Sequence, residues 1–126
     1  MRTHESGEDY LETILRLYRK QGYVRSTDIA NAMNYTKASI SRAVKILKED
    51  GYIYLDPNKM IFLTEKGTQK AVEIYERHEM LTQFLTEVLG IDAETAEHDA
   101  CHMEHAISDS TFQGLKALLE EKRAQA

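Results

Sequence analysis

Residues 26–63, STDIANAMNYTKASISRAVKILKEDGYIYLDPNKMIFL, decide the fold. The polar triplet 26–28 offers capping side chains to a short helix, whose apolar residues follow at once. Residues 34–36 form a turn, and apolar residues at three- and four-residue steps then predict a second helix that ends at Gly51. Two helices joined by so short a turn predict a helix-turn-helix.

The rest of this stretch predicts a β-hairpin. Residues 52–55 (YIYL) and 60–63 (MIFL) are rich in strand-forming side chains, and residues 56–59 (DPNK) between them carry a turn signal. A hairpin placed directly after a helix-turn-helix is the wing of a winged helix. This fold commonly binds DNA.

Helical periodicity continues on both sides of the stretch. Residues 7–20 form an amphipathic stripe before it, and residues 64–90 predict a long helix after it, followed by two shorter helices, the first capped by Asp92. The expected fold class is mainly α with a small β-hairpin, with a winged helix-turn-helix DNA-binding domain at 1–70 and a helical metal-binding and dimerisation domain at 71–126. The second domain has too few apolar residues to bury a large core of its own. We therefore expect its exposed leucine and phenylalanine side chains to pack against another copy of the chain.

The composition narrows the class of protein. The chain has 126 residues, 42% of them hydrophobic, which is enough for a stable core. Its one cysteine, Cys101, excludes an internal disulfide, and no apolar run approaches the roughly 18 residues of a membrane helix. We therefore expect a cytoplasmic protein with neither a membrane span nor a signal peptide.

The charge is distributed unevenly along the chain. Residues 1–70 carry 12 Lys and Arg against 9 Asp and Glu, a net charge of +3, whereas residues 71–126 carry 4 against 12, a net charge of -8. The basic half can meet phosphates, and the acidic half can hold cations while repelling DNA.

The second helix of the helix-turn-helix begins with small and basic side chains, which suit a recognition helix. Small residues allow close approach to a DNA groove, the methyl group of Ala38 can touch thymine, and Arg42 is the best candidate for a guanine edge. Lys48 and the wing's Lys59 are better suited to phosphates. The alternative is an ordinary solvated helix face.

The predicted DNA-contacting residues are Thr36, Lys37, Ala38, Ser39, Ser41, Arg42, Lys45 and Lys59. A single such module reads few base pairs, which favours a dimer on a palindrome.

Residues 97–105, EHDACHMEH, are dense in metal-binding side chains. Helical spacing lets Cys101, Glu104 and His105 converge on one ion, with His98 and His102 along the same side. A thiolate, an imidazole and a carboxylate together suit a divalent transition metal better than calcium or magnesium. Taken one at a time, such residues are usually packing or surface residues.

The whole chain resembles the diphtheria toxin repressor and manganese transport regulator family of metal-dependent repressors. The motifs that carry the resemblance are the helix-turn-helix at 26–50, the hairpin after it, and residues 63–67 (LTEKG), 77–79 (RHE) and 101–108 (CHMEHAIS). The resemblance implies a homodimer that binds double-stranded operator DNA when loaded with a divalent transition metal, and it implies no enzymatic substrate. Longer members carry an SH3-like C-terminal domain that we expect to be absent here.

The resemblance also implies which residues hold the ions. A primary site would take one ligand from the first helix and three from the later one, and a second site would use His78 with either Glu12 or Glu97. The implied metal ligands are Asp9, Glu12, His78, Glu97, Cys101, Glu104 and His105.

The expected metal is set by two conflicting positions. The iron-responsive branch shares Cys101 but has methionine at the place of Asp9, whereas the manganese branch shares Asp9 and Glu12 but has glutamate at the place of Cys101. The iron branch also has a glutamate where this chain has Thr82. Because a thiolate favours softer ions, we expect Fe(II) over Mn(II), with zinc, cobalt or nickel able to substitute.

Two other functions are compatible with parts of the sequence. One is a zinc hydrolase using His98, His102 and His105 with a nearby glutamate as base, but no hydrolase ligand motif is present and the winged helix would be unexplained. The other is a winged-helix regulator that responds to a small organic ligand, in which the His and Cys cluster is incidental.

Overall fold

The computed structural model describes residues 5–125 of the chain. The chain divides into two compact units, one ending at Glu73 and the other beginning at Ile74. The division falls inside the helix α4 (Glu65–Glu87), so each unit contains part of it. The two units are described separately.

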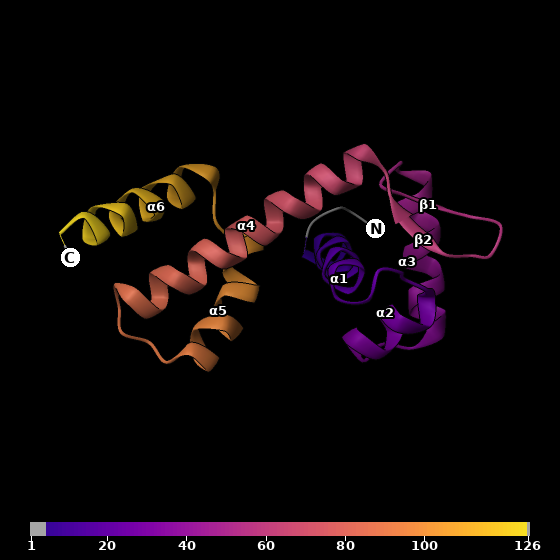
Figure 1. Ribbon diagram of the computed structural model, residues 1–126, viewed down its shortest axis with the longest axis horizontal. Coiled ribbons are helices and arrows are strands. Elements are labelled where there is room, and N and C mark those ends of the chain that lie inside the picture. The colour runs from indigo at the N-terminus through magenta and orange to yellow at the C-terminus, as the bar shows by residue number, and fades with distance from the viewer. Residues whose placement is uncertain (1–4, 126) are drawn as a thin grey trace. The chain divides into compact units, whose positions relative to one another are not determined.

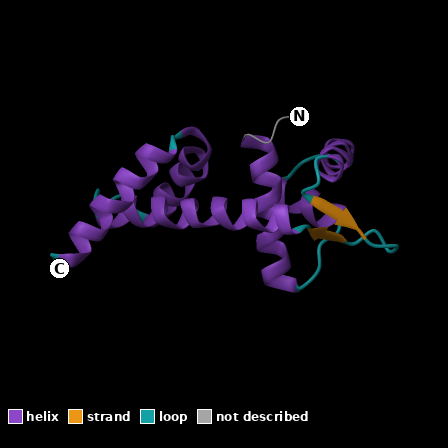
Figure 2. Ribbon diagram, turned by 90° about the horizontal axis from the view of Figure 1, so that it is seen from above, coloured by secondary structure: helices purple, strands orange, loops and turns teal. Residues whose placement is uncertain are grey.

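The first unit is a winged helix. Helices α1 (Glu5–Gln21), α2 (Ser26–Met33) and α3 (Lys37–Glu49) precede strands β1 (Ile53–Leu55) and β2 (Ile61–Leu63) (Figure 1). The two strands pair antiparallel with Tyr54 opposite Phe62, and they form the hairpin drawn in orange in Figure 2. The predicted helix-turn-helix and wing are both present, although each strand is one residue shorter than expected.

Local capping fixes the turn between α2 and α3. Asn34 ends α2 in the left-handed conformation, with φ 58°, and Thr36 begins α3 by accepting a hydrogen bond from Ser39 N at 3.1 Å. The start of α2 differs in detail from the expectation, because Arg25 is the N-cap and Asp28 accepts from the Arg25 backbone N–H at 2.9 Å.

The core of the first unit lies between α1, the helix pair and the hairpin. Helix α1 packs on α2, α3 and β2, and α3 packs on β1. The fully buried side chains in this unit include Leu11, Ile14, Val24, Ile29, Ile40, Leu47, Ile53 and Ile61. Because α1 packs against α2, α3 and β2, it is part of the core of the first unit.

The segment LTEKG attaches the hairpin to α3 and starts α4. Thr64 donates its hydroxyl to Gly51 O at 2.6 Å, and Lys66 Nζ donates to Asp50 O at 2.9 Å. Gly67 N donates to the Thr64 hydroxyl at 3.0 Å, and a Cβ at Gly67 would collide with the backbone carbonyl of Tyr52. Glycine is needed here because the two backbones approach so closely.

The second unit is built from the later part of α4 with α5 (Ala93–Ala106) and α6 (Asp109–Ala124). Asp92 caps α5 as expected, and Ser108 caps α6, each by accepting a backbone N–H bond. Its buried core is formed by Met80, Leu81, Phe84, Leu85, Ala96, Ala100 and Leu119. Among the described residues, no helix is long and apolar enough to cross a membrane.

Candidate metal centre and DNA-contacting surface

Four metal-binding side chains of the second unit meet where α4 faces α5. Glu104 Oε2 lies 3.0 Å from His78 Nδ1, and Glu104 Oε1 lies 3.2 Å from His105 Nε2. Cys101 Sγ is 3.8 Å from the same nitrogen of His78. The structure thus gathers the three α5 residues that helical spacing singled out, and it adds His78 from α4.

Three of these four side chains are buried, and Cys101 is half-buried. The exposed fractions of the His78, Glu104 and His105 side chains are 5%, 0% and 2%. Burying a carboxylate among imidazoles is costly unless positive charge compensates it, whether from a protonated imidazole or from a metal ion. The donor set of nitrogen, sulfur and oxygen is the kind that first-row transition ions prefer, so the residues present fit such an ion.

In the metal-free protein, a protonated His78 imidazole supplies the positive charge that compensates Glu104. Hydrogen bonds to Cys101 and Glu104 raise the pKa of His78 from 6.5 to about 10, against the opposing effect of burial. A ligating imidazole must be neutral, so an ion that uses His78 takes the place of this proton.

Arg77, the neighbour of His78, ties α4 to the C-terminal end of α5. Its guanidinium donates to the backbone carbonyls of Glu104 at 2.9 Å, Ile107 at 3.2 Å and Ser108 at 3.3 Å. It also lies 5.0 Å from the ring centroid of Phe112. One side chain thus binds the Glu104 carbonyl in the last turn of α5 and two carbonyls just after the helix, which fixes the backbone of Glu104. The motif 77–79 is visible in the sequence, but this role of Arg77 is not.

Other predicted ligands lie in different environments. Glu97, the other predicted ligand on α5, is exposed, and so are His98 and His102, which had no predicted role. Thr82, which stands where the iron branch has a glutamate, bonds its hydroxyl back to His78 O at 2.9 Å. In the first unit, the Glu12 side chain is 8% exposed and accepts from Arg16 at 2.9 Å.

The predicted DNA-contacting residues lie on the helix-turn-helix and the wing. Lys37, Ala38, Ser41, Arg42 and Lys45 are exposed along α3. Lys59 is exposed at the hairpin turn. Two of the predicted contacts also serve the fold. The Thr36 and Ser39 hydroxyls lie 3.0 Å apart and cap α3, which leaves them less adaptable toward DNA than Ser41.

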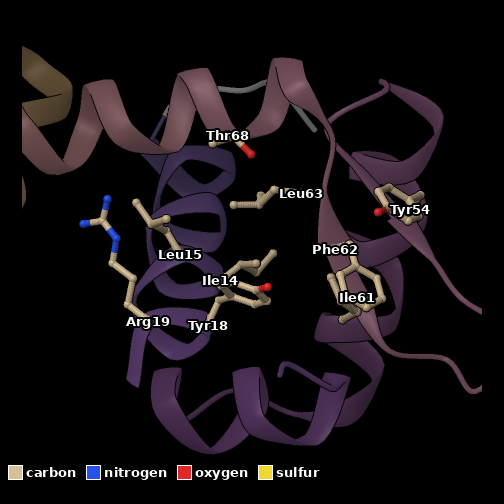
Figure 3. A pocket seen from close by; sticks show the side chains of 9 residues that line it. All are labelled: Ile14, Leu15, Tyr18, Arg19, Tyr54, Ile61, Phe62, Leu63 and Thr68. Carbon is tan, nitrogen blue, oxygen red and sulfur yellow. The ribbon is translucent and has the colours of Figure 1, made fainter. Parts of the chain in front are cut away.

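A separate pocket of about 420 Å³ lies between α1 and the hairpin. Figure 3 shows the side chains of Leu15 and Tyr18 from α1 on one side and Phe62 from β2 on the other. The pocket is mainly apolar, and among the residues that the structure describes no carboxylate, thiol or imidazole lines it. It is therefore not part of the metal centre.

An exposed helix-turn-helix with a wing in one unit, and a buried cluster of metal donors in the other, define a class of protein: a metal-responsive DNA-binding regulator. The chain belongs to the iron-dependent repressor family. The family's N-terminal DNA-binding domain matches residues 2–61, and its metal-binding and dimerisation domain matches residues 64–124. The protein is a metal-dependent transcriptional repressor and not an enzyme, and the resemblance to the diphtheria toxin repressor and manganese regulator family is confirmed.

Individual relatives agree with this assignment. The chain is 36% identical over 118 residues, 93% of its length and 94% of the relative's, to an uncharacterised helix-turn-helix transcriptional regulator of Methanocaldococcus jannaschii. It is 33% identical to the regulator MntR of Lysinibacillus sphaericus, over 91% of this chain and 82% of that one. A manganese-dependent transcriptional repressor solved with manganese superposes with a TM-score of 0.82 and 27% identity, over 90% of this chain and 52% of that one. The chain thus spans about half the length of that solved structure.

Proposed function

We propose that the protein is a metal-gated repressor that binds palindromic operator DNA as a homodimer, with Fe(II) as its ion and genes of metal uptake or homeostasis as its targets. The observation that carries the proposal is the buried contact of Glu104 with His78 and His105, next to Cys101. This cluster is joined by α4 to a winged helix whose exposed side is basic.

Asp9 and Glu12 of α1 are proposed to supply the remaining oxygen ligands. The support is the family resemblance, together with the partial burial of Asp9 and the burial of Glu12. Carboxylates brought near Glu104 would repel one another, and a bound divalent ion would supply the positive charge that removes this repulsion. The two units would then hold one arrangement, which gives the recognition helices a fixed separation.

The gate is a coupling between metal binding and DNA binding. Ligands from both units favour the arrangement in which all of them can bind, and that arrangement is the one that fits the operator. Couplings of this kind are typically about 1 to 3 kcal/mol per site, which corresponds to roughly 5- to 150-fold in operator affinity. By reciprocity, operator DNA should raise metal affinity by the same factor.

Iron is proposed over manganese because of the thiol in the cluster. Manganese is the weakest binder among the first-row divalent ions, and sulfur and nitrogen ligands widen its disadvantage. Manganese is the alternative, since Asp9 and Glu12 offer hard oxygen and one relative is the regulator MntR. The two sets of ligands, Cys101 against Asp9 and Glu12, favour different ions.

The homodimer is proposed from the apolar surface of the second unit. Leu89 is 57% exposed and Leu118 is 46% exposed, while Leu115 is half-buried. A second copy of the chain would cover such side chains. A dimer would also present two recognition helices to two half-sites about one helical turn of DNA apart.

The test is fluorescence anisotropy of the chelator-stripped protein with a labelled palindromic promoter fragment. Ferrous iron is titrated anaerobically and manganese is titrated in parallel. Tight binding with iron at lower free metal than with manganese is the expected result. Selective binding with manganese would give the deciding role to Asp9 and Glu12 instead of Cys101.

A second candidate effector is a small apolar molecule in the pocket between α1 and the hairpin. The pocket's volume of about 420 Å³ is within the range of ligand sites. Such an effector would act on the wing through Phe62 or Tyr54. If a Leu15→Trp variant, which fills the pocket, keeps the metal response and operator affinity of the wild type, this candidate is excluded.

A further inference from the structure

Two histidines on α5 form a pair that the buried cluster does not use. His98 and His102 are four residues apart, so they lie on one face of the helix, and both are exposed. Their ring centroids are 5.1 Å apart and their planes make an angle of 64°. Two imidazoles at this spacing can place one nitrogen each on a single ion, as they do in helical zinc motifs.

A carboxylate lies beside one ring of the pair. Asp99 Oδ1 lies 3.6 Å from His98 Nδ1, so that side of the imidazole faces the carboxylate. Histidines that bind metals commonly direct their second nitrogen to a carboxylate, which fixes the ring and increases its basicity. With Nδ1 turned toward Asp99, Nε2 of His98 is the nitrogen that suits an ion.

The charge of α5 favours a cation. The helix sequence AETAEHDACHMEHA contains no lysine or arginine. Glu94, Glu97 and Asp99 lie exposed within one turn of His98. The position is also open to solvent, since the His98 side chain is 75% exposed, whereas Glu104 and His105 are buried. An ion at the pair could keep water in its remaining positions.

We propose that His98 and His102 form a second, surface metal site on α5 that binds late first-row divalent ions such as zinc or nickel and discriminates against manganese. Nitrogen ligands strengthen binding along the series from manganese to copper, so a site with two imidazoles separates these ions. The site has two protein ligands and water, so it fills at higher metal concentration than a buried site with more ligands. Its existence does not depend on which ion, if any, the buried cluster holds.

The experiment is a nickel titration of the full-length chain followed by calorimetry, repeated with manganese. The wild-type protein is expected to bind one more nickel ion per chain than the His98→Gln variant. Manganese should show no such difference. The histidine side-chain resonances of His98 and His102 should broaden together in the nickel step that the variant lacks. In an Asp99→Asn variant that step should persist with nickel affinity about tenfold weaker.

Matched variants separate chelation from the mere number of histidines. In His102→Gln the extra ion should be lost, and adding Glu94→His should restore it, because residues 94 and 98 are again four apart. Adding Ala93→His instead gives the same histidine count at a spacing of five, which turns the rings to different sides of the helix, and should restore nothing.

The proposal is overturned if the wild-type protein and His98→Gln bind the same number of nickel ions with the same affinity. It is also overturned if the two added histidines restore binding equally well, since that would indicate independent imidazoles. Circular dichroism of each variant, with the tightest nickel step unchanged, shows that α5 and the buried donors are intact.

Discussion

Cys101 sets the softness of the donor cluster. Its sulfur lies 3.8 Å from His78 Nδ1 and it is half-buried, so exchanging it changes the ligand type with little change in packing. In a Cys101→Glu variant we expect operator binding to require less manganese and more ferrous iron than in the wild type. The ratio of the manganese concentration to the iron concentration at half-maximal binding should fall about tenfold. Anisotropy titrations with the two metals measure this ratio. A ratio equal to that of the wild type would show that the thiol does not select the metal.

His78 makes the stability of the metal-free protein depend on pH. Its pKa is raised to about 10 in the folded protein by the hydrogen bonds to Cys101 and Glu104, and it is about 6.5 when unfolded. The stabilisation is therefore complete below about pH 6.5 and is lost as the pH rises toward 10. Urea unfolding of the chelated protein should show a falling free energy of unfolding across this window. In His78→Gln this part of the fall should be missing, and an unchanged slope would refute the assignment.

Some residues of the cluster could be predicted from the sequence alone and others could not. Cys101, Glu104 and His105 follow from helical spacing, because they lie within two turns of one helix. His78 is 26 positions from Glu104, and only the family resemblance pointed to it. The bonds of Arg77 to three backbone carbonyls had no sequence signal, because a carbonyl acceptor carries no side-chain identity.

At the scale of elements, Arg77 holds α5 against α4. Arg77→Met keeps much of the apolar stem but removes the bonds to Glu104, Ile107 and Ser108. We expect a loss of about 2 kcal/mol in the free energy of unfolding, within the range for hydrogen bonds from a charged donor. Metal affinity should also fall. Urea unfolding and a metal-competition assay measure the two effects.

Arg123 provides the control for this substitution. It makes comparable contacts with Glu87 at 2.7 Å and Gln83 at 2.9 Å, but it does so on the surface. Because solvent screens this surface pair, Arg123→Met should lower the free energy of unfolding much less than Arg77→Met and leave metal affinity unchanged. Equal costs for the two variants would mean that the Arg77 bonds have no special structural role.

Gly67 controls the junction of the wing with α4. Alanine usually stabilises a helix relative to glycine, yet here its Cβ would strike the Tyr52 carbonyl. Gly67→Ala is expected to destabilise the protein by about 1 to 3 kcal/mol and to weaken operator binding. Gly114→Ala in α6, where nothing lies near the added Cβ, should instead be neutral or stabilising. Thermal unfolding of both variants gives the comparison, and a stabilising Gly67→Ala would contradict the close approach.

The elements themselves were largely predictable. The helix-turn-helix, the hairpin and the cap of α5 by Asp92 follow from periodicity and turn chemistry, which act over a few residues. The start of α2 was less well predicted, because three adjacent polar residues all suit a cap, whereas the bond from the Arg25 backbone N–H to Asp28 makes Arg25 the N-cap. The close contact of Gly67 with Tyr52 joins residues 15 apart, so no local pattern contains it.

At the scale of the whole molecule, the uneven charge matches the positions of the winged helix and the buried donors along the chain. The half with net charge +3 carries the winged helix, and the half with net charge -8 carries the buried donors. The relatives identify this combination as a metal-dependent repressor, while the proposed choice of metal weighs Cys101 against Asp9 and Glu12. Family membership alone therefore does not settle the metal.

The most direct test of the central claim is the affinity for operator DNA with and without metal, measured by anisotropy on the same protein preparation. Glu104→Gln serves as the gating variant, because it keeps the shape of the side chain and removes the charge between His78 and His105. The exposed Glu94→Gln is its control on the same helix. We predict at least a fivefold gain in operator affinity on metal loading for the wild type and Glu94→Gln, and no gain for Glu104→Gln. Equal operator affinity of the wild type in chelator and in metal would contradict the account.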